Sequence, residues 1–208
     1  MFYIHFTKDF SELSPLSFID YLFEMIKPAT IVVGENFHYG KNRRGTTKLL
    51  ADTAASRFKV EVVPKVKDEG TISSTRIREL LLLGNIKAAN YLLGRKYTLY
   101  GEVIKGKGRG TSLGYPTINI QVDKEKLLPL DGVYKVIVNY DDTEYLGGMF
   151  SRHGVVEVHL LGFSGNLYEK KVAVRLLERI RDIKEFASDN ALKSAIARDI
   201  EKVRDKDL

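Results

Sequence analysis

Three oxygen-bearing side chains, Thr117, Asn119 and Glu157, have the types and spacing expected of a site for phosphate chemistry. Thr117 and Asn119 are two residues apart in a run typical of a strand, so both side chains point to the same face. A threonine hydroxyl and an asparagine carbonyl oxygen are ligands that Mg²⁺ accepts, with phosphate oxygens and waters completing its shell. The alternative is that the two side chains only take part in hydrogen bonds between strands.

Glu157 alternates with valines in residues 155–161 and shares a strand face with His159. A carboxylate beside a bound hydroxyl can accept its proton as a general base during phosphoryl transfer. A glutamate that alternates with valines is also typical of the solvated outer face of a sheet. The periodicity therefore leaves two roles open for Glu157, and it favours a structural role for His159.

Residues 105–117 are rich in glycine and carry three basic side chains, Lys105, Lys107 and Arg109. Glycine lets backbone N–H groups approach an anion closely, and the basic side chains add positive charge, which would suit a triphosphate. The same composition fits a flexible, solvated turn. Residues 101–108 come close to a Walker loop, but Gly108 stands where Ser or Thr is needed and a strand follows in place of a helix. We therefore reject both the Walker and the Rossmann phosphate loops.

The composition limits the remaining chemistry. The chain has 208 residues, a net charge of +6, no cysteine and four histidines. The charge suggests an anionic partner, which can be nucleic acid, a membrane surface or a phosphorylated small molecule. Without cysteine there is no disulfide, thiolate nucleophile or cysteine-bound metal, so any metal is expected to have oxygen ligands. No apolar run is long enough to span a bilayer, and we expect a cytoplasmic location.

The elements that must position these residues differ between the two halves of the chain. Residues 1–94 alternate helix-like segments with two short β-branched runs, 29–33 and 60–63, which is typical of parallel α/β structure. Two strands are too few for a stable parallel sheet, so this half is expected to be part of a domain.

From residue 95 onward, short strands at close spacing predict an antiparallel sandwich or barrel. The expected strands are residues 97–104, 115–120, 133–139, 155–161 and 171–177. An amphipathic helix that begins near Ser188 would cover one side of the barrel. The predicted organisation is an α/β domain over residues 1–94 and a β domain over residues 95–208.

A distinctive set of motifs runs through the second half, with Pro-Thr-x-Asn after the glycine-rich turn as its most specific part. The motifs occupy residues 108–110, 113–119, 128–129, 132–134, 157–163, 167–168, 181–182 and Phe186. Together they resemble the riboflavin kinase part of the bifunctional riboflavin kinase/FAD synthetases of bacteria. That family implies a six-stranded antiparallel β-barrel with a C-terminal helix, which transfers the γ-phosphate of ATP to the 5′-hydroxyl of riboflavin and gives FMN.

The resemblance also implies a role for each matching residue. Glu157 would be the catalytic base, Thr117 and Asn119 would hold Mg²⁺ and phosphate oxygens, and Arg181 would lie on the loop that closes over the flavin. The nucleotide phosphates would be covered by Gly106, Lys107, Gly108, Arg109, Gly110 and Thr111. Residues 147–154 are shorter than the corresponding family segment, which predicts a shortened wall of the pocket.

The first half resembles the later part of the family's adenylyltransferase domain, a Rossmann-like nucleotidyltransferase, on residues 6–8, 33–40 and 72–78. The opening strand and the His-x-Gly-His turn of that superfamily are missing from the sequence. The remaining phosphate site would comprise Ser73, Ser74, Thr75, Arg76 and Arg78 at a helix N-terminus, and the alternative is an ordinary N-cap with two solvated arginines. We expect this partial domain to lack FMN adenylyltransferase activity and to promote self-association through an exposed sheet edge.

Several functions remain open on the sequence alone. The leading one is a Mg²⁺-dependent riboflavin kinase whose partners are the small molecules riboflavin and ATP, without a membrane. One alternative is a bifunctional enzyme that also makes FAD from FMN and ATP, with the missing N-terminal strand supplied elsewhere. The other is a barrel that binds flavin or nucleic acid without turnover. The aromatic residues that would stack nucleic acid bases mostly fall at family-matching positions, so we do not expect nucleic acid as the partner.

Overall fold

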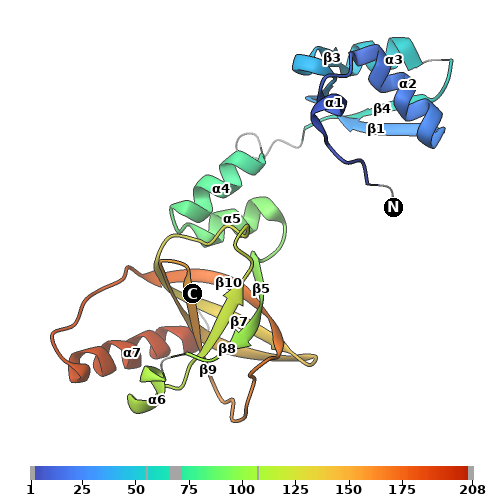
Figure 1. Ribbon diagram of the computed structural model, residues 1–208. Coiled ribbons are helices and arrows are strands. Elements are labelled where there is room, and N and C mark those ends of the chain that lie inside the picture. The colour runs from blue at the N-terminus through green and yellow to red at the C-terminus, as the bar shows by residue number, and fades with distance from the viewer. Residues whose placement is uncertain (1–2, 55, 66–71, 107, 206–208) are drawn as a thin grey trace. The chain divides into compact units, whose positions relative to one another are not determined.

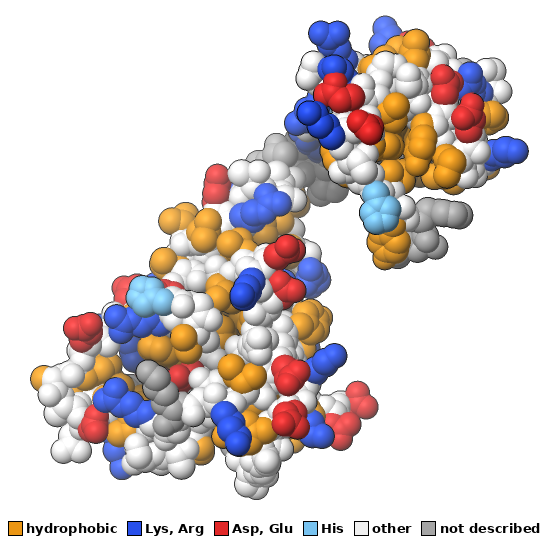
Figure 2. All heavy atoms as spheres, viewed as in Figure 1, with side chains coloured by type: hydrophobic (Ala, Val, Ile, Leu, Met, Phe, Trp, Pro, Cys, Tyr) orange, Lys and Arg blue, Asp and Glu red, His pale blue; other side chains and the backbone are white. Residues whose placement is uncertain are grey.

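The computed structural model describes residues 3–54, 56–65, 72–106 and 108–205 (Figure 1). The chain divides into two compact units, residues 1–72 and residues 73–208. Each unit has its own hydrophobic core. On the face seen in Figure 2, Lys and Arg side chains are interspersed with Asp and Glu side chains over both units.

The first unit is a small α/β structure. Its elements are α1 (Lys8–Ser11), α2 (Pro15–Ile26), β1 (Thr30–Gly34), β2 (His38–Tyr39), the short 3-10 helix η1 (Lys41–Arg43), β3 (Gly45–Thr46), α3 (Thr47–Ala54) and β4 (Lys59–Val63). Strands β1 and β4 pair in parallel, as their two β-branched runs predicted. Helix α2 begins where the Ser14 hydroxyl accepts a hydrogen bond from the N–H of Ser17 at 3.0 Å. Ile19 and Leu50 from the two longer helices are fully buried in the core of this unit.

The second unit is a closed barrel with helices around it. Its strands are β5 (Thr98–Ile104), β6 (Ile118–Val122), β7 (Gly132–Tyr140), β8 (Thr143–Arg152), β9 (Val155–Leu160) and β10 (Lys171–Arg181). The strands close in the order β10-β5-β6-β9-β8-β7, and every neighbouring pair is antiparallel (Figure 1). The predicted six-stranded antiparallel barrel is therefore confirmed.

Three helices and one helical turn complete this unit: α4 (Ser74–Leu82), α5 (Ile86–Leu93), α6 (Arg109–Ser112) and α7 (Asp189–Arg204). Ser188 caps α7, because its hydroxyl accepts a hydrogen bond from the N–H of Ala191 at 3.2 Å. The helix packs on the barrel over Gly148, where an added Cβ would lie 3.4 Å from Cδ1 of Ile200. The C-terminal helix that the amphipathic pattern predicted is confirmed.

Helices α4 and α5 pack on the barrel core through Leu81, Ile86 and Ala89. The buried Asn90 joins α5 to two strands, because its amide nitrogen donates to the carbonyl oxygen of Leu176 at 2.9 Å and its amide oxygen accepts from the N–H of Tyr97 at 2.6 Å. The compact unit thus includes residues that the sequence assigned to the first domain. The predicted boundary between domains 1–94 and 95–208, drawn where the helix and strand pattern changes, stays a prediction.

Residues 147–154, the segment expected to be short, form the end of β8 and the turn into β9. Residues 147–152 of β8 pair in register with β9, from Gly147 opposite Leu160 to Arg152 opposite Val155. The turn has positive φ values of 48° at His153 and 82° at Gly154, which are typical of a tight two-residue hairpin. In the described parts of the chain, no helix combines the length and apolar character that crossing a membrane requires.

Candidate active site

A cavity of about 570 Å³ lies between the outer face of the barrel and helix α7. Its floor is on the outer face because Glu157 and His159 alternate along β9 with Val156 and Val158, which are buried in the barrel core. The rest of the wall comes from β6, β8, the end of β10, α6, and residues 183–188 before α7.

The register between β6 and β9 brings two of the predicted site residues together. Asn119 pairs directly with Glu157 across the two antiparallel strands, so their side chains share one face. Thr117 lies two residues before Asn119 and also lines the cavity. The structure therefore places the three oxygen-bearing side chains of the predicted site in one cavity.

The glycine-rich segment lies so close to these side chains that two of its positions leave no space for a Cβ. A Cβ added at Gly106 would lie 2.0 Å from Nδ2 of Asn119. A Cβ added at Gly110 would lie 2.4 Å from the carbonyl oxygen of Tyr115 and 3.0 Å from Oγ1 of Thr117. Glycine at these two positions is thus required for the close approach of the loop to β6.

His159 holds the segment that precedes Thr117. Its Nδ1 lies 2.8 Å from the carbonyl oxygen of Pro116 and donates this hydrogen bond, since a carbonyl oxygen only accepts. The His159 ring also meets the ring of Tyr115 edge to face, with the centroids 5.5 Å apart. These contacts give His159 the structural role that its sequence pattern favoured, within the cavity wall.

Three ion pairs surround the cavity and bind carboxylates other than Glu157. They are Arg109 with Asp189 at 2.8 Å, Arg152 with Glu185 at 3.8 Å, and Arg181 with Asp199 at 2.6 Å. Among the described residues, the Glu157 carboxylate has no ion pair and faces the cavity half-buried. It is therefore placed to accept a proton from a bound group.

Arg181 lies at the last position of β10, one residue before the loop on which the resemblance placed it. Its Nε donates to Oδ1 of Asp199 at 2.8 Å, and its Nη2 donates to Oδ2 at 2.6 Å. Its Nη1 donates to the carbonyl oxygen of Asp182 at 2.8 Å. Arg181 thus lines the cavity while it is held by α7 and by the loop that follows β10.

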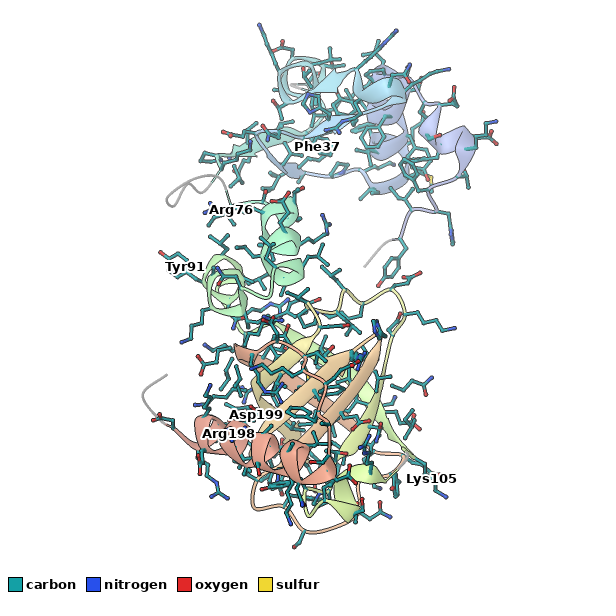
Figure 3. All side chains as sticks on the ribbon, turned by 90° about the vertical axis from the view of Figure 1, so that its left-hand side faces the viewer. Phe37, Arg76, Tyr91, Lys105, Arg198 and Asp199 are labelled. Carbon is teal, nitrogen blue, oxygen red and sulfur yellow. The ribbon has the colours of Figure 1, made fainter. Side chains whose placement is uncertain are left out.

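The other predicted residues differ in position. Gly108, Arg109 and Gly110 line the cavity, Thr111 lies on α6 outside the cavity lining, and Lys107 lies outside the described residues. Ser73 is the N-cap of α4, with its hydroxyl accepting a hydrogen bond from the N–H of Arg76 at 3.2 Å. Figure 3 labels Arg76 on this helix. The predicted phosphate role of residues 73–78 stays a prediction, and none of Ser73, Ser74, Thr75, Arg76 and Arg78 lines this cavity.

Sequence reasoning missed the apolar end of the cavity. It is formed by Phe150 of β8, Phe186 of the loop after β10, and Leu192 and Ile196 of α7. Leu192 and Ile196 lie on the apolar face of the predicted C-terminal helix, but an amphipathic pattern alone does not show that this face borders a cavity. Phe150 lies on β8, a strand that the periodicity did not reveal.

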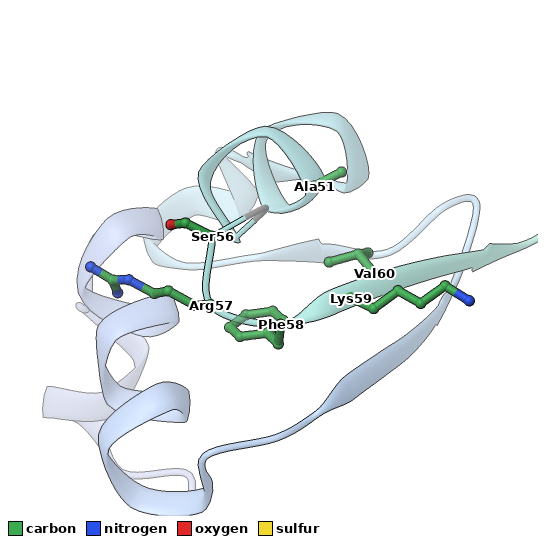
Figure 4. A pocket seen from close by; sticks show the side chains of 6 residues that line it. All are labelled: Ala51, Ser56, Arg57, Phe58, Lys59 and Val60. Carbon is green, nitrogen blue, oxygen red and sulfur yellow. The ribbon is translucent and has the colours of Figure 1, made fainter.

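A second depression, of about 560 Å³, lies in the first unit between α3 and β4 (Figure 4). Both of its charged side chains are paired, Arg57 with Asp20 and Lys59 with Glu61, each at 2.5 Å. Its other lining residues are Ala51, Ser56, Phe58 and Val60. This set lacks a carboxylate or a histidine for acid–base chemistry, so the cavity beside α7 is the stronger candidate.

The chemistry of the cavity is that of oxygen donors. Within the described ranges, no group of three or more His, Asp or Glu side chains is arranged to hold a metal ion. Thr117 and Asn119 supply neutral oxygens, and a hard cation would need further oxygens from a bound phosphate. The site therefore fits a metal ion that enters together with a phosphorylated substrate.

Comparisons with known proteins identify two family matches along the chain. A riboflavin kinase family model matches residues 93–206, and an FAD synthetase family model matches residues 1–76. The bifunctional riboflavin kinase/FMN adenylyltransferase of Buchnera aphidicola subsp. Schizaphis graminum is 38% identical over 217 residues, covering 97% of this chain and 69% of that protein. The protein of the same name from Listeria monocytogenes is 32% identical, covering 98% of this chain and 68% of that protein.

Among solved structures, a protein from Streptococcus pneumoniae described as a macrolide-efflux protein has the same fold. The two chains are 32% identical and align with a TM-score of 0.87, over 96% of this chain and 68% of that one. The description belongs to that protein, and what the match adds here is the shared architecture.

Proposed function

Because the chain belongs to the family of bifunctional riboflavin kinases/FMN adenylyltransferases, and its barrel matches the riboflavin kinase model, we propose that the cavity beside α7 is the kinase site. The reaction transfers the γ-phosphate of ATP to the 5′-hydroxyl of riboflavin and releases FMN and ADP. The observation that carries this proposal is the pairing of Asn119 with Glu157, with Thr117 on the same face and the glycine-rich segment against them.

Glu157 acts as the general base in this proposal. As the 5′-hydroxyl oxygen of riboflavin forms its bond to the γ-phosphorus, the hydroxyl proton moves to the Glu157 carboxylate. The bond between the γ-phosphorus and the bridging oxygen breaks, and ADP leaves with that oxygen. The absence of an ion pair at Glu157 among the described residues supports this role, because no neighbouring cation occupies the carboxylate.

Thr117 and Asn119 would hold Mg²⁺ that enters with ATP. The fit rests on the donor set, which consists of two neutral oxygens and the phosphate oxygens of the substrate, and on the cradle at Gly106 that a Cβ would fill. When bound, the ion neutralises charge on the phosphates. The backbone of Gly108 and Gly110 and the side chain of Arg109 line the same end of the cavity and would contact the phosphates.

The flavin would occupy the apolar end of the cavity. Phe150, Leu192 and Ile196 offer an uncharged wall that suits the planar ring system of riboflavin, which is itself uncharged. Arg181 lies at the same wall with its charge balanced by Asp199. In this arrangement the glycine-rich part of the lining receives ATP and the apolar part receives riboflavin.

The test is FMN formation from riboflavin and ATP, followed by chromatography. Glu157→Gln and Thr117→Ala should each reduce the rate by about 100-fold or more, in line with the loss of a general base or of electrostatic stabilisation. Glu102→Gln is the matched control, since Glu102 is an exposed glutamate on β5 outside the cavity lining. Wild-type turnover that survives both cavity substitutions would refute the assignment. The same chromatogram would show any FAD made from FMN.

A further inference from the structure

The cavity wall contains a buried ion pair that joins the last strand, β10, to the C-terminal helix α7. Arg181 of β10 and Asp199 of α7 have side chains that are only 18% and 10% exposed. Two parallel hydrogen bonds connect them, Nε to Oδ1 at 2.8 Å and Nη2 to Oδ2 at 2.6 Å. Asp199 lies on α7 where the helix packs along the barrel (Figure 3). Such a two-point contact fixes both the position and the plane of the guanidinium group.

The remaining contacts of Arg181 connect this pair to the loop after β10, which lines the cavity. Its Nη1 donates to the carbonyl oxygen of Asp182, and its Cζ lies 5.8 Å from the centroid of the Phe186 ring. A guanidinium group has five N–H donors, and the contacts to Asp199 and Asp182 use three of them. Arg181 thus keeps donors for a ligand while it holds the loop after β10.

Asp199 does more here than attach the helix to the barrel. It lies among Ile196, Ile200 and Val203 on the apolar face of α7, where an unpaired carboxylate would be costly. The helix has a second buried anchor, because Nζ of Lys135 donates to the carbonyl oxygen of Asp205 at 2.5 Å. Lys135 lies outside the cavity lining. A substitution of Lys135 therefore tests the docking of the helix without changing the partner of Arg181.

We propose that Asp199 is a positioning residue for riboflavin. It orients the Arg181 guanidinium group in the cavity wall and neutralises its charge, so that Arg181 contacts an uncharged ring through its free N–H groups. Loss of the Asp199 carboxylate would let the guanidinium group turn and leave its charge unbalanced. The proposal rests on the proposed function, because it takes this cavity as the riboflavin site.

The experiment measures riboflavin binding by quenching of flavin fluorescence, and FMN formation, on the full chain. Asp199→Asn should raise the Kd and KM for riboflavin roughly tenfold or more, as expected when charge-assisted hydrogen bonds are lost, with the KM for ATP unchanged. The double variant Asp199→Asn/Arg181→Gln should bind riboflavin no more weakly than Arg181→Gln alone, because Asp199 acts through Arg181. Lys135→Met is the matched control, which weakens the other anchor of α7 and should leave the Kd for riboflavin unchanged.

Two results with these variants would overturn the proposal. Additive losses in the double variant would show that Asp199 acts independently of Arg181, and an equal rise in Kd for Lys135→Met would show that docking of α7 is all that matters. If Asp199→Asn does not fold, Asp199→Glu replaces it. The longer side chain keeps the charge but displaces the Arg181 guanidinium group, so it should raise the Kd for riboflavin, and an unchanged Kd in that folded variant would overturn the positioning role. Failure of the wild-type chain to bind riboflavin would instead overturn the proposed function.

Discussion

Gly106 lies so close to the Asn119 side chain that the substitution Gly106→Ala should have a large effect on activity. An alanine Cβ at this position would lie 2.0 Å from Nδ2 of Asn119, whereas ordinary contact begins at 3.4 Å. The Asn119 side chain must therefore move by about 1.4 Å, and a displacement of about 1 Å in a catalytic arrangement can cost about 100-fold in rate. We expect kcat for FMN formation to fall about 100-fold, because the obstructed atom belongs to a proposed ligand of Mg²⁺ and phosphate.

Stability and riboflavin binding should change little in this variant. Gly106 lacks a positive φ, so alanine fits its backbone, and the atom that must move is the end of a side chain. The assay is single-turnover FMN formation together with riboflavin titration and thermal unfolding. Gly34→Ala is the control, since Gly34 has ordinary φ and no atom within 4 Å of the added Cβ. Asn119→Ala should be as slow as Gly106→Ala and the double variant no slower. A wild-type kcat in Gly106→Ala would refute the reasoning.

Three further predictions concern stability and the metal ion. Asn90→Ala should lower the free energy of unfolding of the barrel by about 2–4 kcal/mol in urea titrations, because it leaves the N–H of Tyr97 and the carbonyl of Leu176 unpaired. Asn85→Ala on the same helix removes only an N-cap and should cost about 1 kcal/mol, so an equal loss in both would contradict this. Burial raises the pKa of Tyr97 above its ordinary value of 10.0, so its neutral hydroxyl stabilises the fold below pH 10 and that contribution is lost as pH rises through the raised pKa. Tyr97→Phe should therefore flatten the alkaline fall in the urea midpoint, and an unchanged slope would count against it. Chelation of divalent cations should stop FMN formation without abolishing riboflavin binding, and turnover without them would contradict the proposed role of Thr117 and Asn119.

The periodic signals predicted most of the barrel but not the strand β8. Five strands alternate apolar and polar residues clearly, whereas β8 contains Gly147 and Gly148, which have low strand propensity. The structure explains both glycines by close approach. A Cβ at Gly147 would lie 2.7 Å from the carbonyl oxygen of His159, and one at Gly148 would meet Ile200 of α7. The sixth strand was expected only from the family resemblance. Its two glycines are explained by contacts with residues of β9 and α7, which periodicity within β8 cannot reveal.

The role of Glu157 could not be decided from its own strand. Alternation along β9 places Glu157 on the outer face, but only the position of α7 shows that this face borders a cavity. Asp199 did carry a signal, because it is a charged residue within the apolar face formed by Leu192, Ile196 and Val203. Such a residue predicts a buried partner, although its identity as Arg181 depends on the closure of the barrel.

The proposed catalytic arrangement depends on the register between β6 and β9, which these two strands define through few residue pairs. Strands β6 and β9 pair through only two residue pairs, Ile118 with Val158 and Asn119 with Glu157. A slip by one residue would turn Glu157 into the barrel core, so the register must be fixed by a neighbouring pair. The long ladder between β8 and β9, closed by the two-residue turn at His153 and Gly154, supplies this constraint. This ladder and its tight turn therefore align Glu157 with Asn119.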